Sequence, residues 1–342
     1  MKASERRPLG RTALELTVLG FGATAIGNLY RAISNEEAQA TLLAVWAEGI
    51  RYFDTAPLYG VSLSETRLGS YFARKPRNDY VISTKVGRVL EPAAVGERMP
   101  ENIYPSVPLL RPRFDYTRDG IMRSFEESLK RLQLERIDLL YLHDLAPMNH
   151  RSPEEHERHY RDFFGSGGYD AMCSLRSSGQ VGALGVGVGS WEAALRLIQE
   201  GDFEACLLAG RYTLLEQTAL QTFLPECLRR GVGVVVGGPY NSGILATGPI
   251  AGATYNYRPA PPEIMDRVRR IRDICEAHGV DLSAAALQFP LHHPAVVSVI
   301  PGMGSPAELD AAIAALECPI PRGLYADLQS ESLIAAAAPI GN

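Results

Sequence analysis

The sequence has no apolar run of about 18 residues, so it predicts no membrane-spanning helix. Its opening segment, MKASERRPLG, lacks the apolar stretch of a secretory signal, and we therefore expect a cytoplasmic protein. Cysteine is scarce: there are five, an odd number, and no two are spaced as C-x-x-C. This scarcity argues against a disulfide framework and against a zinc site, so no metal site is expected.

The chain also lacks an excess of basic residues. It has 34 Lys and Arg against 39 Asp and Glu, which gives a net charge of −5. Nucleic acids and anionic membranes select basic patches, so neither is expected as the main partner. The 342 residues, 46% of them hydrophobic, are enough to bury a large core. We expect a small-molecule substrate as the partner and a monomer or small homo-oligomer.

Short apolar runs alternate with amphipathic stretches along the chain. Eight runs are expected to form strands, at 18–24, 51–56, 80–85, 138–143, 181–188, 205–210, 232–238 and 296–300. Eight helices are expected near 35–48, 64–73, 118–133, 154–178, 190–200, 216–230, 261–279 and 305–316. Two helix starts have the pattern of capping boxes, Ser34 with Glu37 and Ser305 with Glu308. Eight strand–helix units favour the α/β class and a closed (β/α)8 TIM barrel, formed by one domain over 1–342.

Three segments lie outside this repeat. Residues 6–20 contain two short alternating stretches around Gly10 and predict an N-terminal hairpin that closes the barrel floor. Connections 88–117 and 239–260 are longer than ordinary barrel loops. They follow the third and seventh strands, so both should flank the active-site pocket. The first of them offers polar groups for a substrate, namely Arg88, Glu91, Glu97, Arg98, Asn102 and Arg111.

Ionisable residues stand where three apolar strands end. Asp54 ends the second strand, Lys85 the third and His143 the fourth, and Tyr59 follows Asp54 by five residues. Taken singly, each has an ordinary explanation: a lysine emerging into solvent, a buried histidine, or an aspartate that caps a turn. Strand ends meet on the catalytic face of a barrel. The four together therefore predict a catalytic cluster.

These residues lie in segments that resemble the aldo-keto reductases: FDTAPLYG (53–60), SETRLG (64–69), STKVG (83–87), RIDLLYLHD (136–144), GVGVGSWE (185–192) and VIPGMGSPAELDAAI (299–313). The resemblance runs from about residue 7 to 317. It implies that Asp54, Tyr59, Lys85 and His143 are the catalytic tetrad of a nicotinamide-dependent oxidoreductase. Glu65, in SETRLG, is expected to be structural.

The chemistry of such a tetrad is consistent with these residue types. The cofactor exchanges hydride with a carbonyl carbon, and the protein moves a proton at the oxygen. A free phenol has a pKa near 10, too high for a base at neutral pH, so Lys85 is expected to lower the pKa of Tyr59. Asp54 would keep Lys85 charged. His143 would donate a hydrogen bond to the substrate oxygen.

The resemblance also implies a dinucleotide that lies across the barrel mouth. The expected cofactor contacts are Gly187, Gly189, Gly238, Tyr240, Asn241, Ser242, Gly302, Met303, Gly304 and Glu308. The Ser, Asn and Gln side chains that often hold the nicotinamide in this family are missing, so backbone groups or residues 240–242 are expected to replace them. No Lys or Arg occurs between residues 300 and 315 to bind a 2′-phosphate, and Glu308 would repel one. NAD is therefore the expected cofactor, with NADP as the alternative.

Two segments, LAGRYTLLEQ (208–217) and PYNSGILATG (239–248), narrow the resemblance. They resemble a branch of the family with D-threo-aldose 1-dehydrogenase, L-fucose and L-galactose dehydrogenases and a pyridoxal 4-dehydrogenase. The leading hypothesis is oxidation of the C1 hydroxyl of an aldose, such as L-fucose or a D-threo-aldose, to a lactone. The alternative is a pyridoxal or general aldehyde/ketone oxidoreductase, and the remote alternative a non-catalytic subunit that regulates a channel.

Overall fold

The computed structural model describes residues 1–97, 99 and 103–341. Its central sheet has eight strands, and each neighbouring pair is parallel. In sheet order they are β3 (Phe21–Gly22), β4 (Tyr52–Asp54), β5 (Val81–Val86), β8 (Ile137–His143), β9 (Val181–Val188), β10 (Ala205–Ala209), β11 (Gly233–Gly237) and β14 (Val296–Ile300). All eight match expected strands, although β3 and β4 are shorter than predicted.

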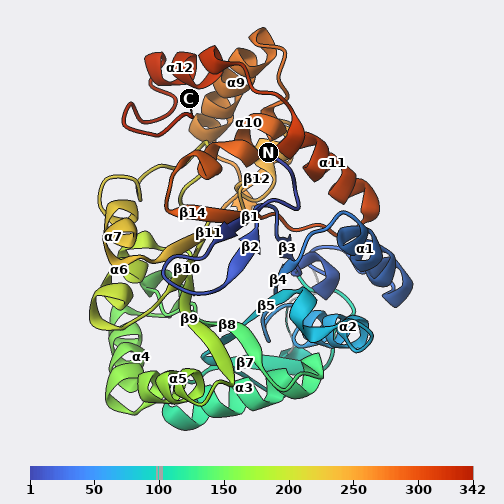
Figure 1. The fold of residues 1–342 in the computed structure, drawn as a ribbon, viewed down its shortest axis with the longest axis vertical. Helices are drawn as coiled ribbons and strands as arrows, with labels where there is room; N and C mark the ends of the chain where they lie inside the picture. The colour runs from blue at the N-terminus through green and yellow to red at the C-terminus, as the bar shows by residue number, and fades with distance from the viewer. Residues whose placement is uncertain (98, 100–102, 342) are drawn as a thin grey trace.

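The sheet closes on itself between its first and last strands. Parallel bridges join Leu19 to Val299 and Gly22 to Gly302. Gly20 N donates to Val299 O at 2.9 Å, and Val299 N donates to Val18 O at 2.9 Å. Figure 1 shows the strands around the centre and helices outside them. The predicted (β/α)8 barrel is therefore confirmed.

Twelve helices are described: α1 (Asn35–Ala47), α2 (Leu63–Phe72), α3 (Arg118–Leu132), α4 (Pro153–Gly165), α5 (Gly168–Ser177), α6 (Trp191–Glu200), α7 (Phe223–Arg230), α8 (Ile244–Thr247), α9 (Pro262–Ala277), α10 (Leu282–Gln288), α11 (Pro306–Glu317) and α12 (Arg322–Ser330). The helix expected over 154–178 is two helices, because Gly167 between them has a φ of 77°. The helix expected from residue 216 begins only at Phe223, and α10 and α12 were not predicted.

Only one of the two predicted capping boxes is complete. At α1, Ser34 Oγ accepts from Glu37 N at 3.0 Å and Glu37 Oε2 accepts from Ser34 N at 2.7 Å. At α11, Ser305 Oγ accepts from Glu308 N at 3.3 Å, but the Glu308 carboxylate accepts from Gly304 N at 2.6 Å. The prediction of a second capping box was therefore wrong in one bond: the Glu308 carboxylate accepts from the N–H of Gly304, the residue before Ser305, and not from that of Ser305 itself.

The N-terminal hairpin closes the floor of the barrel, as predicted. Its strands, β1 (Arg6–Pro8) and β2 (Glu15–Thr17), pair antiparallel. Leu9 and Leu16 are fully buried and pack in a cluster of side chains inside the barrel. At the turn, Gly10 has a φ of 53°, and any Cβ there would collide with the carbonyl of Gly231. Only glycine fits this contact.

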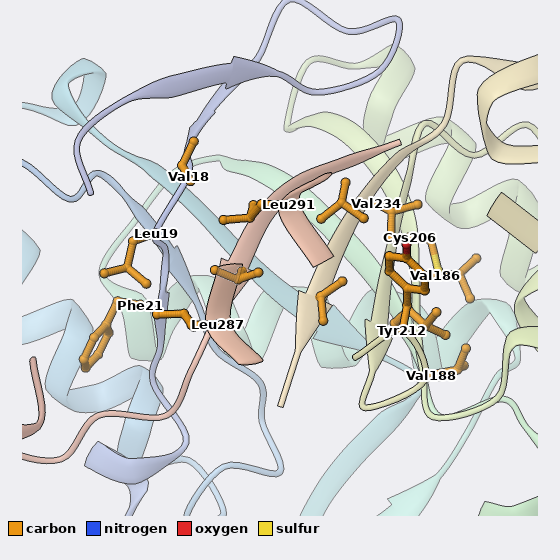
Figure 2. Close-up of a cluster of buried hydrophobic side chains, with 14 of the residues drawn as sticks. Val18, Leu19, Phe21, Val186, Val188, Cys206, Tyr212, Val234, Leu287 and Leu291 are labelled. Carbon is orange, nitrogen blue, oxygen red and sulfur yellow. The ribbon is translucent and has the colours of Figure 1, made fainter. Parts of the chain in front are cut away.

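The strands alternate between an inner core and an outer core. Inside the barrel the cluster includes Tyr52, Leu139, Tyr141, Ala183, Ala205, Leu207 and Val235. The outer core lies between strands and helices, and Figure 2 shows part of it: Val18, Leu19, Phe21, Val186, Val188, Cys206, Val234, Leu287 and Leu291. Side chains at the upper ends of the inward-facing rows therefore point into the mouth of the barrel.

Both long connections contain secondary structure that was not predicted. Segment 88–117 forms an antiparallel hairpin of β6 (Arg88–Pro92) and β7 (Leu110–Phe114). Segment 239–260 contains α8 and a small hairpin of β12 (Thr254–Tyr255) and β13 (Arg258–Pro259). Across the described part of the chain, none of the helices has both the length and the apolar character needed to span a membrane.

Candidate active site

Neighbouring strands bring three of the four predicted residues to the barrel mouth. Asp54 is the last residue of β4, Lys85 lies near the end of β5, and His143 is the last residue of β8. Tyr59 lies in the turn after β4, where its backbone N–H donates to Ala56 O at 3.0 Å. We refer to Asp54, Tyr59, Lys85 and His143 as the polar tetrad.

Lys85 and Asp54 form a buried ion pair at the centre of this tetrad. Lys85 Nζ lies 2.6 Å from Asp54 Oδ2 and donates to Thr55 O at 2.7 Å. The two side chains are only 1% and 2% exposed. Burial lowers the pKa of Lys85 and raises the pKa of Asp54, and their mutual attraction opposes both shifts. Each charge therefore depends on the other for its stability.

Tyr59 lies beside this pair. Lys85 Nζ is 4.6 Å from the centroid of the Tyr59 ring, and the rings of Tyr59 and His143 are 6.1 Å apart at 89°. Burial, together with the negative charge of Asp54, raises the pKa of Tyr59 well above its ordinary value. The net shift of this pKa is therefore upward, which is opposite to the lowering expected from Lys85. The ammonium lies against the ring face, and its charge is already balanced by Asp54.

His143 is a neutral imidazole in this pocket. Burial lowers the pKa of His143 to about 3. Its Nε2 lies 3.4 Å from Asp144 Oδ2, and its Nδ1 has no hydrogen-bond partner among the described residues. Tyr116 OH donates to the His143 carbonyl at 2.8 Å and fixes the backbone here. A neutral ring can still donate one hydrogen bond to a substrate oxygen.

Asp144 is a pocket residue that the sequence reasoning missed, although it directly follows His143 in the quoted LYLHD segment. Its backbone has a φ of 57°, and Arg88 Nη2 donates to its Oδ2 at 2.6 Å. The guanidinium of Arg88 lies 4.1 Å from the ring centroid of Phe114. Burial alone would raise the pKa of Asp144, but the charge of Arg88 and the hydrogen bond that it donates act in the other direction, and the pKa is lowered. An ionised carboxylate therefore stands beside the tetrad.

Glu65 lies outside the pocket. Its side chain is fully buried, and its carboxylate accepts from Thr84 Oγ1 at 2.6 Å and from Arg131 Nε at 2.6 Å. Thr84 precedes Lys85 on β5, so its side chain points to the outer face of the strand. Glu65 therefore ties β5 to α3. This is the structural role that was expected, achieved by an ion pair.

Of the expected cofactor glycines on β9 and just after it, Gly187 lies beside the tetrad and Gly189 beside Met148. A Cβ on Gly187 would lie 3.6 Å from Lys85 Cε, so the missing side chain leaves space directly above Lys85. A Cβ on Gly189 would lie 3.5 Å from Met148 Sδ, and the Gly189 carbonyl accepts from Arg211 Nε at 2.9 Å. These positions fit a flat ring that approaches the backbone closely.

Most of the cofactor contacts that were expected just after β11 have side chains that contact other parts of the protein. Asn241 is buried, accepts from Thr213 Oγ1 at 2.6 Å and donates to Gly210 O at 3.1 Å. Ser242 Oγ accepts from Tyr257 N at 3.1 Å and so holds the β12–β13 hairpin. Tyr240 packs against the outer core, and Gly238 is exposed with a φ of 58°. The side chains of Asn241 and Ser242 thus mainly support the loops.

The segment before α11, residues 302–304, is exposed to solvent at its first residue. Gly302 is exposed, whereas the side chain of Met303 is buried in the outer core. A Cβ on Gly304 would lie 3.6 Å from Glu308 Oε2 and 3.8 Å from Arg31 Nη2. Arg31 is thus a cation near this segment that comes from the first strand–helix loop. Only the backbone of Met303 is left to contact a ligand.

Both long connections lie near the barrel mouth: Arg88 of the first contacts Asp144 beside the tetrad, and the second helps to line a cleft that contains none of the four tetrad residues. A cleft of about 400 Å³ is lined by Pro147, Met148, Gly189, Ser190, Trp191, Glu192, Arg211, Glu216, Thr218, Tyr255 and Asn256. Tyr255 and Asn256 come from the 239–260 segment. From the 88–117 segment, Arg88 contacts Asp144, whereas Glu91 and Glu97 pair with arginines of their own hairpin. Arg98 and Asn102, also expected at the pocket, lie outside the described residues.

Comparison with known proteins agrees with this geometry. Residues 18–331 match the Aldo/keto reductase family. The chain is 42% identical to a pyridoxal 4-dehydrogenase of Microbacterium luteolum, over 98% of this chain and 99% of that protein. It is 44% identical to a D-threo-aldose 1-dehydrogenase of a Pseudomonas species, over 94% of this chain and 95% of that protein.

A solved structure shows the same fold. The aldo-keto reductase of Bacillus halodurans in its holo form superposes with a TM-score of 0.73 at 24% identity, and the match covers 98% of each chain. The family match covers most of the chain, and the two dehydrogenases align over nearly all of it. The chain belongs to the aldo/keto reductase family of oxidoreductases.

Proposed function

We propose that this protein oxidises the C1 hydroxyl of an aldose to a lactone, with NAD as the preferred hydride acceptor and the polar tetrad as the catalytic group. A bound nicotinamide would supply the acceptor for the hydride that leaves C1. The Tyr59 oxygen takes the hydroxyl proton, Lys85 stabilises the phenolate, and Asp54 holds Lys85. His143 donates a hydrogen bond to the reacting oxygen. The observation that carries the proposal is the buried Asp54–Lys85 pair beside Tyr59.

The glycines around the mouth fit the cofactor. Gly187 leaves room beside Lys85, and the backbone at Gly302 is exposed before the N-terminus of α11. Helix N-termini favour phosphate groups. Gly187 would accommodate the nicotinamide, and the 302–308 segment would hold the adenosine end, with Glu308 as acceptor for a ribose hydroxyl.

Two relatives support two substrate classes. The similarity to a D-threo-aldose 1-dehydrogenase favours a sugar, and the similarity to a pyridoxal 4-dehydrogenase favours pyridoxal as the second candidate. The deciding measurement is NAD reduction against aldoses including L-fucose, pyridoxal and simple alcohols. Turnover of a sugar supports the aldose assignment. Turnover of pyridoxal alone would transfer the assignment to the second candidate, and turnover of only simple alcohols or aldehydes would reject both.

Asp144 is expected to recognise a hydroxyl next to the reacting carbon, because its ionised carboxylate lies 3.4 Å from His143 Nε2. Replacing it by asparagine keeps the shape but removes the charge. We expect Asp144→Asn to lower kcat/KM for an aldose by about 10- to 100-fold, the range for a lost hydrogen bond to a charged group. A simple aldehyde should be reduced nearly as fast as by the wild type.

The matched control is Glu97→Gln, which neutralises an exposed carboxylate in the 88–117 connection, paired with Arg111 of the same segment. Its kinetics should match the wild type for both substrates. An equal loss for aldose and simple aldehyde in Asp144→Asn would contradict hydroxyl recognition, because such a loss would come from the tetrad itself.

Cofactor preference should depend on Glu308. Its carboxylate would repel a 2′-phosphate, so wild-type kcat/KM is expected to be higher with NAD than with NADP. Glu308→Arg should narrow or reverse this preference, since arginine binds phosphate bidentately. Glu317→Arg, at the other end of α11, makes the same change in net charge and should leave the ratio unchanged. If the wild type prefers NADP, the 2′-phosphate is bound by other cations, with Arg31 the nearest to Gly304.

A further inference from the structure

Two tyrosines inside the barrel carry hydroxyl groups that packing alone does not require. Tyr52 and Tyr141 are fully buried, in a cluster whose other members are leucine, alanine, valine and isoleucine. Phenylalanine would fill the same space without burying a polar group, which costs free energy unless it is hydrogen-bonded. The two hydroxyls therefore call for a specific explanation.

The hydroxyls are linked to the tetrad. The oxygens of Tyr141 and Tyr52 lie 3.2 Å apart, and Tyr52 OH lies 3.1 Å from Ser83 Oγ. Ser83 Oγ donates to Asp54 Oδ1 at 2.7 Å. Asp54 Oδ2 is the oxygen that contacts Lys85. One oxygen of the carboxylate thus faces the ammonium and the other faces a chain of three hydroxyls.

The direction of the chain follows from its last member. An ionised carboxylate can only accept, so Ser83 must donate to Asp54. Ser83 Oγ then accepts the proton of Tyr52, and Tyr52 accepts that of Tyr141. Each link points toward Asp54, and hydrogen bonds in such a chain strengthen one another.

The backbone around the two rings is shaped to admit them. A Cβ on Gly185 would lie 2.5 Å from Tyr141 Cδ1, and a Cβ on Gly20 would lie 2.7 Å from Tyr52 Cδ1. Contacts under 3.0 Å are not tolerated, so both glycines leave space for a tyrosine ring. The absence of a side chain at Gly185 therefore serves the packing of the core, because the Tyr141 ring fills that space.

We infer that Ser83, Tyr52 and Tyr141 are positioning residues, a directed hydroxyl chain that holds the Asp54 carboxylate in place from below while Lys85 binds it from above. This inference rests on the proposed role of the tetrad. The chain orients Asp54 and favours its ionised form, which in turn keeps Lys85 protonated beside Tyr59. Ser83 contacts Asp54 directly, and the tyrosines act through Ser83.

The other titratable groups near the pair come from several elements. They are Tyr59 after β4, Glu65 on α2, and His143 and Asp144 at the end of β8. The hydroxyl chain differs from all of these because it contacts the oxygen of Asp54 that Lys85 leaves free. Loss of the hydroxyl chain should therefore change the pKa and orientation of Asp54 directly, and affect Lys85 only through Asp54.

The test compares pH profiles of kcat for aldose oxidation in Ser83→Ala, Tyr52→Phe and Tyr141→Phe. Without the donor, Asp54 protonates at higher pH, so the acid limb of the profile moves to higher pH. We expect this limb to move by about one pH unit in Ser83→Ala, the scale of one hydrogen bond to a charge, and the alkaline limb to stay in place, because Asp54 is ionised there in every variant. The shift should be smaller in Tyr52→Phe and smallest in Tyr141→Phe.

The matched control is Tyr212→Phe. This phenol is also fully buried, but its hydroxyl has no hydrogen-bond partner among the described residues. Its profile should coincide with that of the wild type. Profiles that coincide with the wild type in all three chain variants would overturn the inference, and so would an equal shift in the control. The phenylalanine variants keep the rings in place, so folding is preserved even if Ser83→Ala destabilises the protein.

A second readout does not depend on turnover. The Asp54 carboxyl carbon can be followed by NMR in protein labelled at aspartate, with Asp54→Asn for assignment. Its titration should move to higher pH in Ser83→Ala, and an unchanged titration would overturn the inference. Absence of turnover in the wild type would overturn the proposed function alone, because this titration would still test the chain.

Discussion

Replacing Tyr59 with phenylalanine is expected to lower kcat by about 10²-fold or more, the usual cost of removing an acid–base group. The aromatic ring remains, so its contact with the Lys85 ammonium, at 4.6 Å from the ring centroid, is kept. The Kd for NAD should therefore be unchanged. Steady-state kinetics and a fluorescence titration of NAD measure the two quantities separately.

The pH dependence makes this expectation sharper. Burial raises the pKa of Tyr59, so the phenol form dominates at neutral pH. Oxidation needs the phenolate, whose fraction rises tenfold per pH unit below the pKa, so kcat for oxidation should increase with pH. Reduction needs the phenol and should already be fast at neutral pH. Both trends should vanish in Tyr59→Phe and persist in Tyr212→Phe.

Lys85→Met provides a second variant of the same site. It removes the cation beside Tyr59 and leaves Asp54 buried without its partner. The value of kcat should fall by a factor similar to that for Tyr59→Phe, and the pH profile of kcat for oxidation should move. A Tyr59→Phe enzyme with turnover within a few-fold of the wild type would end the assignment of Tyr59 as the proton carrier.

Replacing Glu65 with alanine is expected to cost about 3 kcal/mol of unfolding free energy, the scale for breaking a buried ion pair. Glu65 is fully buried, and its loss leaves Arg131 and Thr84 without their main partner. Chemical denaturation measures the change. The exposed Glu126 of α3 is the matched control, and Glu126→Ala should change stability by less than about 0.5 kcal/mol.

The double variant Glu65→Leu with Arg131→Leu tests the cause of this loss. Replacing both charges by apolar side chains avoids an unpaired buried charge and should recover much of the stability. If Glu65→Ala costs under about 1 kcal/mol, the ion pair is not what holds β5 to α3.

The barrel and the tetrad could be predicted because each depends on a local pattern. Eight apolar runs separated by amphipathic stretches favour a parallel sheet covered by helices, whatever their detailed packing. Asp54, Lys85 and His143 stand at the ends of such runs, and the ends of parallel strands meet on one face. The floor hairpin was also visible, from two alternating stretches on either side of Gly10.

Helix limits and the structure of the long connections were harder to predict. The break at Gly167 within the expected 154–178 helix depends on one residue with a positive φ. The hairpins within 88–117 and 239–260 are held by contacts with the rest of the barrel, such as Arg211 with Asn256 and Arg88 with Asp144. Such contacts join residues far apart in sequence, and periodicity carries no information about them.

What the sequence by itself determined is therefore the order of strands, the closed barrel and the identity of the four polar residues at its mouth. Only the tertiary structure decided what surrounds them. It brought the carboxylate of Asp144 to 3.4 Å from His143 Nε2 and bonded the side chain of Asn241 to Thr213. It buried Met303 and filled the space at Gly185 with Tyr141. It also reversed the expected pKa shift of Tyr59. The physical reason is that burial and charge balance depend on side chains from distant segments, which only folding brings into contact.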